Sequence, residues 1–449
     1  MDKMEKKSFI QKDEKIFYLF FVVLLFLQVL LIFFSNSDNH LIGGDGAYYF
    51  AYLRSIMFDH DINLNNEIAL YNSILPVNHP DNVGMLNLPQ IYAFPIGTSI
   101  LWAPFFIFAH LLALILVLFG INVPLNGYSV LHEASVYFAG MFYGFIGILL
   151  IYRFSKHFFS ENISLISTII LIFSSSAIYY ILIEPSMSHA PSMFAVSLFL
   201  YLLYFYPSRG GILGLSAGLM LLVRWQDAIF LCALLYKTIF DYTPKKDFTK
   251  LKNFIITIVT AFITFIPQLL LWKNVYGKFI LIPQGNNFIN WFTPKIPDIL
   301  FSTQHGLISW TPVILICLIG LILFYQKEKK IFLSLVTIFL LNLYVNACVA
   351  GDLGGGASFG MRRFVDCSIV FVIGLCAFIE FINQKITLKT TTIILSLLII
   401  WNGLFIVQYR LGFVDPEKPL SWQEMTVDKF FMLFKVMDKI KEIYNRKIR

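Results

Sequence analysis

The chain has 449 residues, of which 58% are hydrophobic and 14% are charged. Soluble proteins average about 25% charged residues, so this composition excludes an ordinary soluble domain and predicts a polytopic membrane protein. The formal net charge of +7 does not indicate nucleic acid as a partner, because in such a protein the distribution of lysines among the loops is what carries information. We expect membrane lipids as partners and no nucleic acid.

Apolar segments recur along the whole chain. The first covers residues 16–35 and follows a lysine-rich N-terminus. It has about the length that crosses a bilayer, and we interpret it as a retained span. Eleven further apolar segments fall at about 97–119, 132–152, 163–183, 190–206, 211–224, 228–240, 253–272, 306–325, 331–350, 365–383 and 390–409.

Basic residues gather in alternate connectors, near residues 153–156, 209, 237–252, 327–330 and 385–389. The positive-inside rule assigns these connectors and the N-terminus to the cytoplasm. If all twelve segments crossed, the later basic connectors would lie outside. We therefore expect segment 97–119, which contains Pro104 and His110, to stay in the outer interface or to re-enter from that side. About eleven transmembrane helices remain, with 211–224 and 228–240 counted as two.

The predicted fold is an all-α polytopic membrane protein with a long first extracytoplasmic loop, at about 36–131, that carries membrane-surface helices. In this loop Asp45 stands between glycines and opens a helical pattern marked by Tyr48, Tyr49 and Tyr52. Asp is also a favoured helix N-cap, so a purely structural role for Asp45 remains open. We assign residues 1–411 to one transmembrane domain and 412–449 to an amphipathic surface helix.

Polar residues suited to chemistry gather in the outer connectors. Two carboxylates, two imidazoles and three arginines occur there. These residues are Glu184, His189, Arg224, His305, Asp352, Arg362 and Arg363. Several have an ordinary structural alternative: a helix terminator for Glu184, hydrogen-bonded structural histidines, and headgroup anchors for the arginine pair 362–363. Asp59, His60 and Asp61 are weak metal candidates, so a divalent cation stays open and no other cofactor is expected.

This constellation resembles the GT-C superfamily of membrane glycosyltransferases, in the branch of protein O-mannosyltransferases and lipid A aminoarabinose transferases. Asp45 matches the position of the family's catalytic carboxylate just after the first span. The family has a proline-containing stretch before its second span, which 94–97 and Leu101-Trp102 resemble. It also has an acidic outer connector, which 184–189 resembles. A basic span end of the family is similar to Leu222-Val223-Arg224. The family commonly has Asp where this chain offers Glu184, and we expect no large C-terminal outer domain.

The resemblance implies a polyprenyl-phosphate sugar donor and an acceptor hydroxyl on a lipid, glycan or protein, at the outer face of the cytoplasmic membrane. Inverting transfer needs a base near the acceptor, and Asp45 is assigned that role. Cations must stabilise the departing phosphate, and Arg binds phosphate in a bidentate manner. The expected phosphate-binding residues are Arg224, Arg362, Arg363 and His305, and the expected substrate contacts are Tyr48, Tyr49, Glu184, His189 and Asp352.

Two other classes of protein stay open at this point. A transporter or lipid flippase is also polytopic, but it is expected to carry charged residues near the middle of the bilayer and often shows paired repeats. A structural or assembly subunit of an envelope complex needs none of these polar outer loops. Most charges in this chain fall at span ends, which favours the transferase.

Overall fold

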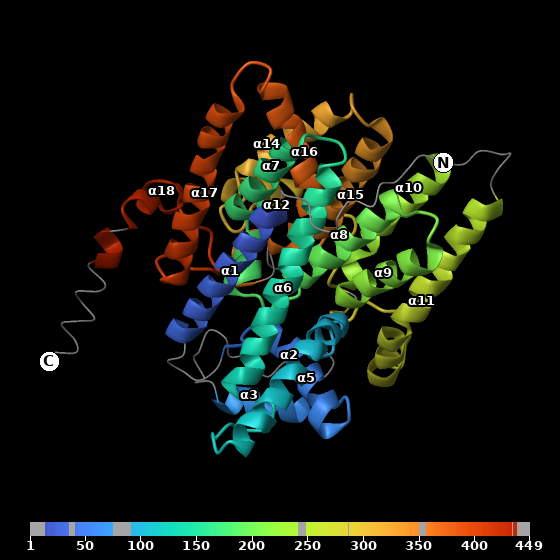
Figure 1. Cartoon of the computed structure of the whole chain (residues 1–449), viewed down its shortest axis with the longest axis vertical. Coiled ribbons are helices and arrows are strands. Elements are labelled where there is room, and N and C mark those ends of the chain that lie inside the picture. The colour runs from blue at the N-terminus through green and yellow to red at the C-terminus, as the bar shows by residue number, and fades with distance from the viewer. Residues whose placement is uncertain are drawn as a thin grey trace. The chain divides into compact units, whose positions relative to one another are not determined.

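The computed structural model describes residues 14–35, 41–74, 91–240, 248–285, 287–349, 356–432 and 434–437. The regular secondary structure of these residues is helical, and the strand-like pairing within them is an isolated antiparallel bridge between Ile289 and Val349. Figure 1 shows the helices in chain order. The all-α expectation is confirmed.

The chain divides into two compact units. The first contains 1–153, 180–227 and 251–283, and the second contains 154–179, 228–250 and 284–449. Each unit is therefore assembled from segments far apart in the sequence. The division runs through the stretch 1–411, which was predicted as one domain.

The first unit is built around two long aromatic-rich helices, α1 (Glu14–Ser35) and α6 (Val130–Ser155), which run side by side in Figure 1. Ring contacts join them, with centroids 4.7 Å apart for Phe17 and Tyr152 and 4.8 Å apart for Phe21 and Phe145. The other helices of this unit are α2 (Asp45–Arg54), a π-helix at Ser55–Asp59, α3 (Asn65–Ile74), α5 (Gly97–Leu118), α8 (His189–Phe205), α9 (Gly210–Val223) and most of α11 (Phe248–Tyr276).

The second unit depends on a very close crossing of two helices, α14 (Val313–Phe324) and α16 (Ser368–Ile382). A Cβ built on Gly320 would lie 1.9 Å from the Gly374 carbonyl oxygen, and one built on Gly374 would lie 2.0 Å from that of Cys317. Only glycine allows this approach. The remaining helices are α7 (Glu161–Ser174), α10 (Cys232–Phe240), α12 (Ile296–Phe301), α13 (Leu307–Trp310), α15 (Lys329–Ala347), a 3₁₀ turn at Arg362–Phe364, α17 (Leu388–Arg410), α18 (Trp422–Met425) and α19 (Val427–Phe430).

Within the described residues, six helices are long and apolar enough to cross a membrane: α1, α5, α6, α11, α15 and α17. Five shorter apolar helices, α7, α8, α9, α14 and α16, have 10–17 residues each. The chain is thus a multi-pass membrane protein, as its composition predicts. The count of about eleven crossings stays a prediction.

Pro104 does not interrupt the helix of segment 97–119. Helix α5 runs without interruption through Pro104 for 22 residues, and by length and composition it could cross a membrane. Its polar residue is also paired, since His110 Nδ1 lies 3.2 Å from His132 Nε2 of α6. An exposed Pro104 loses one backbone hydrogen bond without a steric conflict with a neighbouring helix. The placement of α5 in the outer interface stays a prediction.

Several predicted segments are divided in the structure. Arg224 separates α9 from a 3₁₀ helix at Trp225–Leu231, and its backbone is extended at φ −148° and ψ 112°. The region 211–240 is therefore not one continuous α-helix, in agreement with its interpretation as two segments. Segment 163–183 similarly ends in a π-helix at Tyr179–Ile183, and 306–325 is interrupted between Trp310 and Val313.

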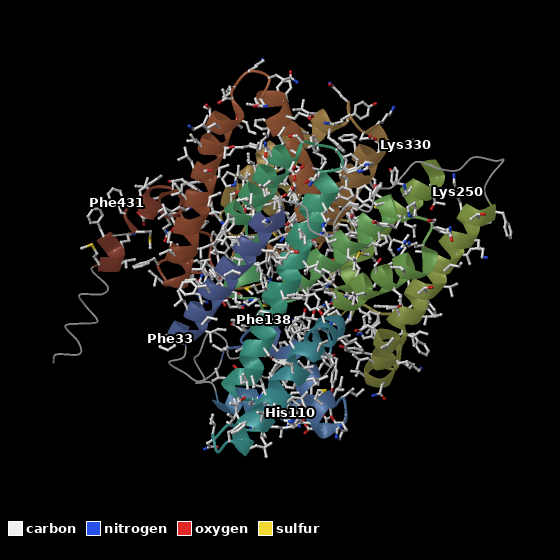
Figure 2. The ribbon with its side chains drawn as sticks, in the orientation of Figure 1. Phe33, His110, Phe138, Lys250, Lys330 and Phe431 are labelled. Atoms are coloured by element: carbon white, nitrogen blue, oxygen red, sulfur yellow. The ribbon has the colours of Figure 1, made fainter. Side chains whose placement is uncertain are left out.

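The basic connectors at Lys250 and Lys330 belong to the second unit, and Figure 2 shows both side chains toward the same end of that unit in this view. Lys250 lies in the first turn of α11 and Lys330 in the first turn of α15. The assignment of the two connectors to the cytoplasmic side stays a prediction.

The tail after α17 begins with two four-residue helices, α18 and α19, rather than with one long helix. Lys429 is fully buried there, with its Nζ 3.8 Å from the ring centroid of Trp401 and 3.7 Å from that of Phe405. Phe430, Phe434 and Met437 are exposed, as expected for the apolar face of a surface helix. The other predicted members of that face, Leu433, Ile440 and Tyr444, lie outside the described residues.

The crossing of α14 and α16 gives a test of the second unit. Gly374→Ala should destabilise the protein by about 1–3 kcal/mol, because overpacking forces two backbones apart. The measurement is thermal unfolding in detergent. Gly403→Ala in α17 is the matched control, since a Cβ there meets nothing within 4 Å and alanine favours a helix. Equal unfolding temperatures for the two variants would contradict the packing described.

Candidate functional site

Asp45 opens helix α2 in the first unit. The N-cap position is Gly44, whose φ of 53° lies in the left-handed region that favours glycine, and the helix has no side-chain cap. Asp45 is therefore the first helical residue rather than the cap, and it is half-buried. The helix dipole favours a negative charge at this end. The structural alternative of an N-cap does not describe this residue.

The Glu184–His189 connector lies directly against the start of α2. A Cβ on Gly46 would lie 2.8 Å from the Ser186 carbonyl oxygen, so the two backbones are in contact. Tyr49 Oη donates a hydrogen bond to Ser188 Oγ at 2.9 Å. The structure thus brings the Asp45 helix and the acidic outer connector together within one unit.

The same connector is supported from the other side by α6. A Cβ on Gly140 would lie 1.9 Å from the carbonyl oxygen of Pro185. Because no other residue type permits this contact, Gly140 fixes the distance between α6 and the connector. Glu184 is half-buried at its start.

Arg224 reaches this connector through His189. Its Nη1 lies 3.4 Å from His189 Nδ1, and both side chains are buried, at 8% and 5% exposure. The His189 ring also packs on Tyr180 at a centroid distance of 4.7 Å. A guanidinium is thereby held beside the loop that contacts the Asp45 helix.

Backbone contact also fixes the position of Arg224 along the chain. A Cβ on Gly97, at the start of α5, would lie 2.2 Å from the carbonyl carbon of Leu222. Leu222 and Val223 directly precede Arg224. The residues singled out at 94–97 and 222–224 therefore touch each other in the first unit.

The expectation that Tyr48 and Tyr49 offer rings to a sugar does not agree with their burial. Tyr48 is 2% exposed and stacks on Phe94 at 4.4 Å with an interplanar angle of 5°, and Tyr49 is 4% exposed with its ring edge-on to Trp102. Most of α2 is buried as well. Burial, together with the nearby Asp45 charge, raises the pKa of Tyr48 well above its usual range.

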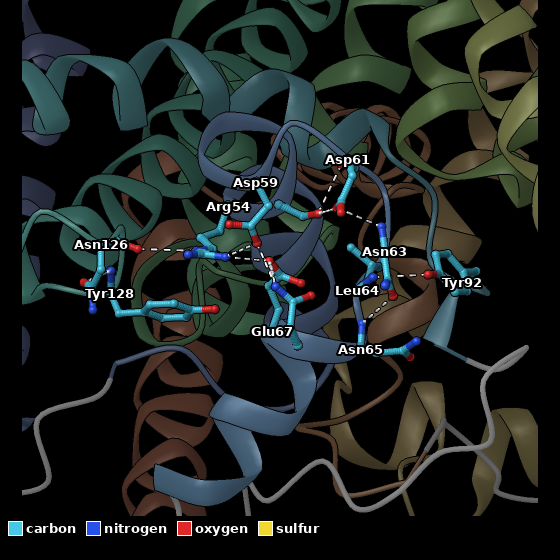
Figure 3. Close-up of polar contacts among 12 residues, drawn as sticks. Arg54, Asp59, Asp61, Asn63, Leu64, Asn65, Glu67, Tyr92, Asn126 and Tyr128 are labelled. Atoms are coloured by element: carbon cyan, nitrogen blue, oxygen red, sulfur yellow. Dashed lines mark hydrogen bonds and ion pairs between the residues drawn. The ribbon is translucent and has the colours of Figure 1, made fainter.

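A second polar cluster lies in the first loop around Arg54 (Figure 3). Its guanidinium pairs with Asp59 and, at 2.9 Å, with Glu67 Oε1, while its Nε donates to the Asn126 carbonyl oxygen at 3.3 Å. Asn66 Nδ2 donates to Asp59 at 2.7 Å and to Glu67 at 3.3 Å. We call these four side chains the Arg54 knot: Arg54, Asp59, Asn66 and Glu67.

The two carboxyl groups of the Arg54 knot have opposite pKa shifts. Burial, together with a hydrogen bond to Asp59, raises the pKa of Glu67 to about 7. The hydrogen bond with Glu67 lowers the pKa of Asp59. Below about pH 7, a protonated Glu67 beside an ionised Asp59 and Arg54 is therefore the favoured state.

The metal candidates of the first loop are engaged in other contacts. Asp59 pairs with Arg54, and Asp61 Oδ1 accepts hydrogen bonds from Ser55 Oγ at 2.7 Å and from the Asn63 amide at 3.0 Å. His60 is exposed and has a φ of 59°. Across the described residues no group of three His, Cys, Asp or Glu side chains is arranged to hold a metal ion.

The other predicted site residues belong to the second unit. His305 is 1% exposed and packs on Trp310 at 5.0 Å, and Trp310 in turn packs on Phe359 at 5.7 Å. Arg362 and Arg363 follow on the 3₁₀ turn and are half-buried. Trp310 thus lies between His305 and the chain segment that leads to the arginine pair. Asp352 lies outside the described residues.

Three residues of the first unit that contribute to this arrangement were not predicted from the sequence. Ser188 bonds Tyr49, Ser192 Oγ donates to Asp227 Oδ2 at 2.6 Å, and Gly140 supports the connector. Ser188 and Ser192 are four residues apart and so share one helical face. The spacing of these two serines, next to an acidic connector, is the sequence feature that could have indicated their role.

The chain is similar to known proteins in both sequence and fold. A family model described as dolichyl-phosphate-mannose-protein mannosyltransferase matches residues 103–272, which include His189 and Arg224 but not Asp45. No curated protein matches the chain. Among solved structures, apo ArnT from Cupriavidus metallidurans superimposes with a TM-score of 0.51 at 10% identity, over 88% of this chain and 66% of that chain.

A second structure, ArnT from the same organism bound to undecaprenyl phosphate, gives a TM-score of 0.50 at 11% identity, over 87% of this chain and 65% of that chain. The chain shares the fold of these ArnT structures. This likeness agrees with the fold that the resemblance drawn from the sequence implies. The chain spans about two thirds of the length of the ArnT structures that it matches.

The Arg54 knot predicts a pH dependence of stability. The folded pKa of Glu67, about 7, lies above its ordinary value of 4.5, so its contribution is complete below the ordinary value and is lost as the pH rises through about 7. Glu67→Gln, which cannot ionise, should become progressively more stable relative to the native protein between about pH 4.5 and pH 7, and the difference should level off above that range. The measurement is the unfolding temperature of both proteins in detergent. Parallel curves would contradict the shifted pKa.

Proposed function

We propose that this protein is a membrane glycosyltransferase that moves a sugar from a polyprenyl-phosphate-linked donor to an acceptor hydroxyl, at the extracytoplasmic face of the cytoplasmic membrane. One observation carries the proposal: the connector that touches the start of the Asp45 helix continues directly into His189, which contacts Arg224. A carboxylate and a guanidinium are thus gathered around one buried loop. These are the two charges that phosphate displacement by a hydroxyl requires.

The proposed reaction is a single displacement with inversion. The carboxylate of Asp45 takes the proton of the acceptor hydroxyl as the hydroxyl oxygen forms a bond to the anomeric carbon. The bond from that carbon to the phosphate oxygen breaks, and the electron pair leaves with the polyprenyl phosphate. Arg224 stabilises the negative charge that develops on the leaving phosphate, because charge-assisted contacts are strongest where the charge grows.

The remaining residues receive supporting roles. Glu184 contacts the sugar or the acceptor, and His189 orients Arg224. For Arg362, Arg363 and His305, contact with the donor phosphate stays a prediction from the sequence, as does substrate contact by Asp352. The acceptor class is a lipid, a glycan or a protein, since a GT-C fold serves many acceptors.

The donor class is supported by two similarities. The matching family is described by a lipid-phosphate sugar, dolichyl-phosphate-mannose, and one matching ArnT structure contains undecaprenyl phosphate. Both compounds join a long isoprenoid chain to a phosphate. A multi-pass protein of this composition is able to accommodate such a chain among its helices.

Asp45→Asn tests the catalytic base. We expect turnover to fall by about a hundred- to ten-thousand-fold, the usual contribution of general base catalysis, with little change in folding. The measurement is release of polyprenyl phosphate from a panel of synthetic polyprenyl-phosphate sugars in proteoliposomes.

Asp298→Asn is the matched control for Asp45→Asn, because Asp298 is also an acidic residue in the first turn of a helix and is exposed. Its turnover should stay at the native level. Native turnover in Asp45→Asn would remove the base assignment. Movement of the intact donor across the bilayer without release of phosphate would favour a flippase instead.

Cysteine labelling tests the proposed sidedness. On a background without the five native cysteines, His60→Cys should react with a membrane-impermeant maleimide in intact cells. Asn383→Cys, in the basic connector after α16, should react only after permeabilisation. Both positions are exposed. Labelling of both from outside would overturn the proposed topology.

A further inference from the structure

The turn that carries Arg224 contains a second buried charge. Asp227 follows three residues later, its amide donates to the Arg224 carbonyl oxygen at 3.0 Å, and its side chain is 1% exposed. Arg224 itself is 8% exposed. A guanidinium and a carboxylate are therefore both removed from water within a single turn, directly after α9.

The first turn of α8 contacts both charges. His189 Nδ1 lies 3.4 Å from Arg224 Nη1, and Ser192 Oγ donates to Asp227 Oδ2 at 2.6 Å. Residues three apart share one face of a helix, so one face of α8 holds the turn at two points. The residue before α8, Ser188, accepts the hydrogen bond from Tyr49 of the Asp45 helix.

The hydrogen bond between Ser192 and Asp227 is stronger than the contact between His189 and Arg224. At 2.6 Å it has the length of a charge-assisted O–H···O⁻ hydrogen bond, which is about twice as strong as a neutral one. A buried carboxylate depends on such bonds, because it has lost its hydration. The bond therefore fixes the turn itself, whereas His189 contacts the guanidinium end of the Arg224 side chain.

We propose that Asp227, held by Ser192, is a positioning residue for the binding of the donor's polyprenyl phosphate by Arg224. A guanidinium on a fixed turn loses less freedom when it binds a phosphate than one on a loose turn. Asp227 does not touch the reacting atoms in this assignment. The inference rests on the proposed function, because it takes the phosphate of that donor as the ligand of Arg224.

The experiment compares three serine and aspartate variants of the full-length protein. Ser192→Ala removes the hydroxyl that bonds Asp227, and Asp227→Asn removes the charge with little change of shape. Ser197→Ala is the control, since Ser197 lies on the same helix, is equally buried and has no hydrogen-bond partner for its Oγ among the described residues. The probe is undecaprenyl phosphate, and its Kd is measured in detergent by native mass spectrometry.

We expect Ser192→Ala and Asp227→Asn each to weaken binding of undecaprenyl phosphate by about tenfold, the effect of losing one charge-assisted hydrogen bond. Ser197→Ala should bind within about twofold of the native protein. Unfolding temperatures are measured in parallel. A role in folding alone would lower the unfolding temperature of Ser192→Ala and leave its Kd unchanged, and that result would overturn the inference.

The experiment distinguishes failure of the inference on Asp227 from failure of the proposed function. If the native protein binds undecaprenyl phosphate and all three variants bind equally well, Asp227 has no positioning role and the proposed function stands. If the native protein does not bind the probe, the proposed donor class and this inference are both wrong. Should Asp227→Asn fail to fold, Ser192→Ala against Ser197→Ala decides the question by itself.

Discussion

The candidate site depends on glycines that let backbones touch. Gly46 allows α2 to contact the Glu184–His189 connector, Gly140 allows α6 to support it, and Gly97 allows α5 to contact the residues before Arg224. Side chains at these positions would separate the elements by a van der Waals diameter. Such contacts are rigid because interiors are close-packed and backbones cannot change rotamer. Main-chain contact thus sets the backbone positions of Asp45 and of the residues before Arg224, and the hydrogen bond between Ser192 and Asp227 adds a further restraint on the turn after α9.

Much of this architecture was predictable from the sequence. Hydropathy predicts the apolar helices. The resemblance to GT-C glycosyltransferases singles out Asp45, the acidic connector and Arg224. These features depend on local composition, which a single sequence displays. Pro104 was given weight as a helix-disrupting residue, yet the helix of this strongly apolar segment continues through it.

Other features depend on the partners that folding brings together, and a sequence does not display those. Tyr48 and Tyr49 look like an interfacial pair, yet Phe94 and Trp102 enclose them. Asp59 and Asp61 look like metal ligands, yet Arg54 and Ser55 engage them. In each case the partner decides between a functional and a structural role. For Asp227 the partner instead indicates a functional role, because its hydrogen bond comes from Ser192, 35 residues earlier in the chain.

The shortness of α9 has a consequence for the bilayer. Its 14 residues extend about 21 Å, whereas the hydrocarbon layer is about 30 Å thick. If Arg209 marks the cytoplasmic boundary, as the positive-inside rule predicts, Arg224 lies about 9 Å below the outer headgroups. A lipid phosphate must then descend to meet it, or the bilayer must thin locally. Turnover would accordingly depend on acyl-chain length, so that the thickness of the host membrane becomes a determinant of activity.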